Sequence, residues 1–69
     1  MDSRLIHQLW SIVDATPKTR LSNLDDSGVL HWLVDLLQDD PAFDARQLPV
    51  VSSYIRSRMP LIRELAQQF

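Results

Sequence analysis

The chain has 69 residues, 45% of them hydrophobic, with one glycine, no cysteine and a formal net charge of −2. This length fits a single small domain over residues 1–69, and the composition is that of a folded chain rather than a disordered one. The lack of cysteine excludes disulfides, thiol catalysis and thiolate zinc sites, and no apolar run approaches the ~20 residues of a membrane-spanning helix.

The first predicted helix covers residues 3–15. Its apolar side chains fall on one side at about 100° per residue, and most of its polar side chains fall on the other. Asp2 or Ser3 can cap its start. Thr16-Pro17 should end it, because the residue before a proline avoids the helical region.

A second helix is predicted over residues 24–38, where Ser22 and Asp25 are spaced as in a capping box. This segment is apolar over more than half of its circumference, so it needs cover on two sides. Gly28 in its first turn lowers helix propensity by about 1 kcal/mol. It is either simply tolerated there or lets a neighbouring helix pack closely.

The last third of the chain predicts a short helical turn near 43–47, followed by a longer helix over 49–67. Phe43 is expected to plug the open end of the core. The apolar spacing of three and four residues keeps its phase across Pro60, which favours one kinked helix with this proline facing solvent. We therefore predict an all-α fold, a small bundle of three main helices plus a short helical turn. Its core is predicted to contain Leu5, Leu9, Ile12, Val13, Leu30, Leu33, Leu37, Ile55, Met59 and Ile62.

Arg58 stands out because a continuous helical count places it inside the apolar arc of the last helix. Three environments are open to it. Its aliphatic stem can cover leucines while the guanidinium reaches water, it can pair with Asp35 or Asp14, or it can contact a partner at an interface.

A protein partner, including a second copy in a homodimer, is the predicted binding target. The wide apolar arcs of the second and third predicted helices exceed what so short a chain easily covers by itself. All charges between residues 21 and 45 are negative, whereas residues 46–69 carry four arginines against one glutamate. This asymmetry suits intramolecular or head-to-tail pairing, or simply reflects acids at helix starts and turns. Both tryptophans are expected mainly in the core, although a half-exposed one would suit a groove edge. The predicted partner-binding residues are Trp32, Tyr54, Arg56, Arg58 and Arg63.

The alternative function is nucleic-acid binding through the arginine-rich third helix, which the acidic residues 21–45 disfavour. An enzyme is not expected. His31 and Asp35 are four residues apart, but no nucleophile accompanies them, and a solvated pair is the simpler interpretation. Neither histidine belongs to a metal-binding motif, so no metal or other cofactor is expected. With no signal-peptide pattern, the sequence predicts a soluble, cytoplasmic location.

Three stretches, LIHQLWSIVDAT, LDDSGVLHWLVDLL and YIRSRMPLIRELAQ, together cover most of the chain. In them the sequence resembles a group of short, uncharacterised helical proteins encoded in cyanobacteria. The resemblance implies a cytoplasmic accessory protein that adapts a larger complex. It carries no assigned activity and no site residues.

Overall fold

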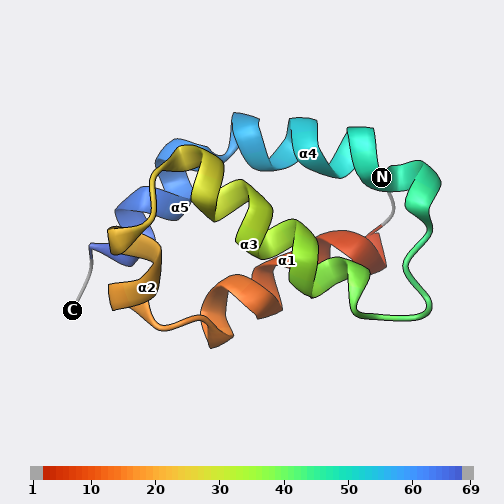
Figure 1. The fold of residues 1–69 in the computed structure, drawn as a ribbon, viewed down its shortest axis with the longest axis horizontal. Coiled ribbons are helices and arrows are strands. Elements are labelled where there is room, and N and C mark those ends of the chain that lie inside the picture. Colours follow the sequence, from red (N-terminus) through yellow and green to blue (C-terminus); the bar gives the residue numbers. More distant parts are fainter. Residues whose placement is uncertain (1–2, 68–69) are drawn as a thin grey trace.

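The computed structural model describes residues 3–67, and every regular element within them is helical (Figure 1). The elements are α1 (Ser3–Ala15), α2 (Lys18–Asn23), α3 (Asp26–Gln38), the 3-10 turn η1 (Ala45–Gln47), α4 (Leu48–Ser57) and α5 (Met59–Ala66). The all-α prediction is confirmed, but the predicted bundle of three main helices was too coarse. None of the helices in this described part is long and apolar enough to cross a membrane.

α2 is the helix that the sequence prediction missed. Pro17, expected only to end the first helix, also precedes the first residue of α2, and its φ of −57° suits that position. α2 packs against α5, and its one buried side chain is Leu21. The six residues of α2 form too few turns to show a clear periodic pattern, so packing rather than propensity decides their conformation.

The predicted kinked helix over 49–67 is instead two helices, α4 and α5, joined at Arg58. Pro60 has no N–H to bond the carbonyl four residues earlier, and its ring crowds that carbonyl, so α4 ends at Ser57. Pro60 is exposed in the first turn of α5, as predicted for its direction, and Pro49 likewise sits in the first turn of α4.

Aspartates cap α3 and η1. Asp25, rather than Ser22, caps α3, because its carboxylate accepts a 2.7 Å hydrogen bond from the Gly28 N–H. A Cβ on Gly28 would lie 3.1 Å from that carboxylate and 3.2 Å from Leu24. The glycine therefore leaves room for the carboxylate of Asp25 and for the side chain of Leu24. Asp44 caps η1 in the same way through the Arg46 N–H, and this confirms the helical turn predicted near 43–47.

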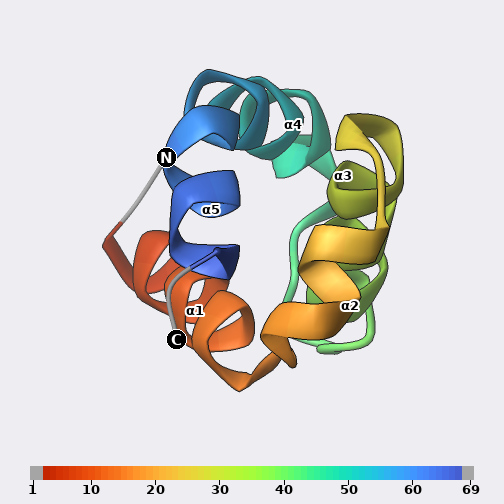
Figure 2. The ribbon, with the colours of Figure 1, turned by 90° about the vertical axis from the view of Figure 1, so that its left-hand side faces the viewer.

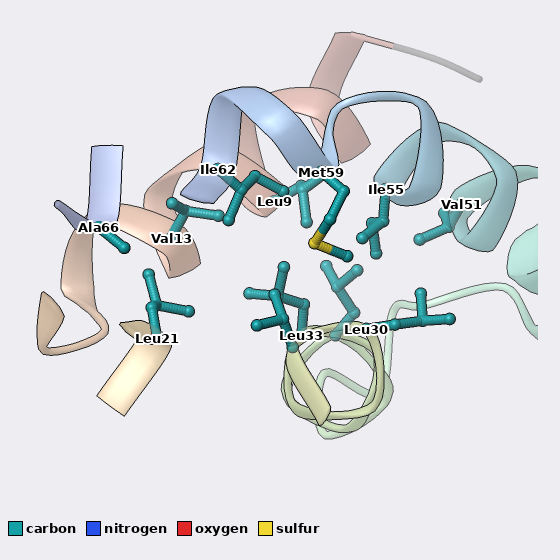
Figure 3. Close-up of a cluster of buried hydrophobic side chains, with 12 residues drawn as sticks. Leu9, Val13, Leu21, Leu30, Leu33, Val51, Ile55, Met59, Ile62 and Ala66 are labelled. Carbon is teal, nitrogen blue, oxygen red and sulfur yellow. The ribbon is translucent and has the colours of Figure 1, made fainter. Parts of the chain in front are cut away.

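The helices enclose one core, with α3 packed against both α1 and α4 (Figures 1 and 2). Met59, at the start of α5, points toward α3, where Leu30 and Leu33 point back at it (Figure 3). All predicted core residues are buried except Leu5 and Ile12, which are half-buried and pack against the core. Phe43 also packs against it. The buried apolar residues that the prediction omitted are Leu21, Val29, Val51 and Ala66.

Candidate functional site

An apolar groove lies between α1 and α3, and we call it the Trp32 groove. It has a volume of about 380 Å³. The side chains lining it come from α1, from the corner before α2 and from one flank of α3. They are Gln8, Ile12, Ala15, Thr16, Pro17, Trp32, Leu36 and Asp39.

Trp32 is held in place by a short chain of hydrogen bonds. Its indole Nε1 donates to the hydroxyl of Thr16 at 3.1 Å, and that hydroxyl donates to the carbonyl of Ile12 at 2.7 Å. Thr16 is only 6% exposed. The corner at Thr16-Pro17 therefore fixes an aromatic ring at the groove edge, since both polar groups of the pair have partners.

Charged side chains border the Trp32 groove at both ends. The guanidinium of Arg20 lies 4.8 Å from the centre of the Trp32 ring, a cation–π contact. Lys18 is exposed next to Pro17 at the same end. At the other end lies Asp39, and Asp35 is exposed one turn earlier on α3, three residues after Trp32. The middle of the Trp32 groove is therefore apolar, and the end at Asp39 is acidic.

A second aromatic cluster lies on the opposite flank of α1. Trp10 and Tyr54 meet edge to face, with ring centres 6.5 Å apart, and the Trp10 Nε1 donates to the Tyr54 hydroxyl at 3.1 Å. The guanidinium of Arg58 lies 5.2 Å from the Tyr54 ring centre. Val50, one turn before Tyr54 on α4, is 46% exposed. We call Val50, Tyr54 and Arg58 the α4 ridge.

The helix junction explains why Arg58 is not inside the apolar arc. A count of 100° per residue assumes a continuous helix, whereas the backbone at Arg58 leaves helical geometry with φ −103° and ψ 5°. Its side chain is exposed, and the ion pairs of residues 3–67 do not include it. Of the three environments open to Arg58, the ion pair with Asp35 or Asp14 is therefore not formed within residues 3–67.

Arg63 is occupied within the fold. Its Nε donates to Asp26 Oδ1 at 3.0 Å, and its Nη1 donates to the backbone carbonyl of Leu21 at 2.8 Å. It thereby connects α5 to both α2 and α3. Arg56 lies on the flank of α4 that faces α3, at a shallow hollow that Asp26 also lines.

A smaller polar hollow of about 190 Å³ lies between α1 and the connection before α4. Asp40 accepts hydrogen bonds there from the Ala42 N–H at 2.9 Å and from Gln8 Nε2 at 2.7 Å. These donors, the amide first and then Gln8, hold the pKa of Asp40 below its usual value. Hydrogen bonds from Arg46 lower the pKa of Asp44 in the same way, and that carboxylate raises the pKa of Arg46.

The predicted partner-binding residues do not gather on one surface. Trp32 lies at the groove, Tyr54 and Arg58 on the α4 ridge, Arg56 on the opposite flank of α4, and Arg63 in an internal contact. The groove residues that the prediction omitted are mostly ones it assigned to helix ends or to the core, such as Pro17 and Ile12. Both tryptophans are half-buried.

His31 and Asp35 are both exposed, and the hydrogen bonds of the described residues do not join them. Within residues 3–67, no group of three or more His, Asp or Glu side chains is placed to hold a metal ion. Comparison of the chain with protein-family models, curated proteins and solved structures finds no match. The resemblance to the cyanobacterial group stays a prediction.

Proposed function

We propose that this chain is a non-enzymatic protein–protein interaction module that binds its partner in the Trp32 groove. The observation that carries the proposal is the fixed position of Trp32 at the edge of an apolar groove, where Thr16 holds its N–H. A tryptophan that is already oriented loses little conformational entropy on binding, which is why such residues often dominate interface energetics.

The charges beside the groove indicate the chemistry of the partner. Leu36 lies between Trp32 and Asp39 along this flank of α3, and Asp35 extends the acidic end. A partner that fits presents an apolar side chain to the middle of the groove and a cation to Asp35 and Asp39. Of the arginines in the nucleic-acid alternative, Arg63 is less available because it is already paired with Asp26.

A charge placed inside the groove tests this function. Leu36→Lys introduces an ammonium into the groove, at a position that is half-buried but does not belong to the buried core. Gln38→Lys places the same group at an exposed position of α3 outside the groove and is the matched control. Both are compared with the wild type by affinity capture from native extract, with quantitative mass spectrometry, and by sedimentation equilibrium.

We expect Leu36→Lys to lose the bound protein, including any self-association, and Gln38→Lys to retain it. Equal binding by all three chains would show that the groove is not the binding site. An electrophoretic mobility shift of random DNA or RNA at low salt, unaffected by Leu36→Lys, would favour the nucleic-acid alternative instead.

A further inference from the structure

The α4 ridge has the complementary chemistry to the Trp32 groove. Val50 is 46% exposed and presents an apolar side chain, and Arg58, directly after the last residue of α4, presents a cation over the Tyr54 ring. The distance from Val50 to Arg58 corresponds to about 12 Å of helix, and that from Trp32 to Asp39 to about 10 Å. Along the helix axis, the apolar and the charged groups are therefore separated by similar lengths on the two surfaces.

We infer that the partner in the Trp32 groove is the α4 ridge of a second copy of this chain. This inference rests on the function proposed above and names its partner. In the contact, Val50 enters the apolar middle of the groove beside Trp32, and Arg58 meets the carboxylate of Asp39. The acidic α3 of one copy thus attracts the basic residues 46–69 of the other copy.

Two copies of the same surface do not complete each other in this way. Two α4 ridges that face each other offer no carboxylate to Arg58, and two grooves that face each other leave both apolar middles without a projecting side chain to fill them. The groove–ridge contact has opposite charges and is therefore favoured.

The two surfaces lie on different sides of the molecule. Ile12 lines the groove, whereas Trp10 contacts Tyr54 of the ridge, and these α1 residues differ in direction by about 200°. Two copies therefore use one contact at a time and leave a free groove and a free ridge. Association of this head-to-tail kind continues into longer chains of subunits or closes into a ring.

Charge reversal tests the contact directly. We compare the wild type, Asp39→Arg and Arg58→Asp by analytical ultracentrifugation from micromolar to millimolar concentration. Circular dichroism checks that each variant is folded, since both positions are exposed. We expect the wild type to associate with increasing concentration and each variant alone to associate about tenfold more weakly or worse. Mixing the two variants should restore association, because every contact between one variant and the other then pairs opposite charges.

Val50→Ser and Leu61→Ser supply a matched apolar comparison, because Val50 is 46% and Leu61 45% exposed. Leu61 lies on α5, outside the ridge. We expect Val50→Ser to weaken association roughly tenfold, as for the loss of one buried aliphatic side chain, and Leu61→Ser to leave it unchanged.

A wild type that stays monomeric at millimolar concentration would overturn the inference, as would a mixture of charge variants that does not recover. If the wild type is monomeric but captures another protein, and Leu36→Lys loses that protein, the proposed function of the groove stands. Only the identification of the partner as a second copy is then wrong. If Leu36→Lys changes neither capture nor association, both proposals fail.

Discussion

Arg63 allows a quantitative test of how this small fold holds its helices together. Its side chain is only 28% exposed, and its guanidinium donates to both the Leu21 carbonyl and Asp26. Asp26 is 72% exposed, so the ion pair itself contributes only about 0–1 kcal/mol. The part-buried bond from a charged donor to the carbonyl contributes more, about 1.5–3 kcal/mol. Arg63→Ala should therefore lower the free energy of unfolding by about 2 kcal/mol.

For a domain of this size, that loss lowers the Tm by roughly 8–16 °C. Arg63→Lys should cost about half as much, because an ammonium cannot reach two acceptors in the forked geometry of a guanidinium. Asp26→Asn should cost less than about 1 kcal/mol. Arg56→Ala, which removes an exposed arginine from α4, is the control and should stay within about 0.5 kcal/mol of the wild type.

Thermal and urea unfolding followed by circular dichroism at the helical band measure all four variants. The critical result is the order of the four variants by their loss in free energy of unfolding. If Asp26→Asn destabilises as much as Arg63→Ala, the ion pair rather than the Leu21 carbonyl holds α5. If Arg63→Ala unfolds like Arg56→Ala, the contact contributes nothing and the reasoning is refuted.

Two further predictions concern the polar contacts that fix α1. Thr16→Val removes the acceptor of the Trp32 N–H and should lower the free energy of unfolding by about 1–3 kcal/mol. Thr16→Ser keeps the hydroxyl and should lower it clearly less. Urea unfolding measures both variants. Because the fold lowers the pKa of Asp40, its carboxylate contributes stability above the unfolded pKa of about 4, and this contribution is lost as the pH falls through the folded pKa. Gln8→Ala removes one of the donors and should be less stable than the wild type at neutral pH, by a margin that narrows below about pH 4. Gln38→Ala, at an exposed position, should show no pH-dependent margin, and a margin for Gln8→Ala that is constant with pH would contradict the linkage to Asp40.

The candidate surfaces depend on tertiary contacts that the sequence pattern does not contain. Trp32 was identified as a candidate, but a groove depends on which elements flank it. Thr16 and Pro17 could be assigned only as a helix end, although together with α1 they form one wall of the Trp32 groove. Arg63 carries the same charge as Arg56 and Arg58, and only the position of the Leu21 carbonyl distinguishes it as an internal contact.

The sequence by itself determined the helical class, the extent of α1 and most of the core, because apolar spacing along a helix directly sets which side is buried. Even across Pro60 the inward residues Ile55, Met59 and Ile62 were correctly assigned. Tertiary structure alone decided that α2 forms, since it is short and gains its stability by packing on α5. It also decided that the chain breaks at Arg58 and turns this residue to solvent. Periodicity describes a single continuous helix, whereas breaks and grooves depend on how neighbouring helices meet.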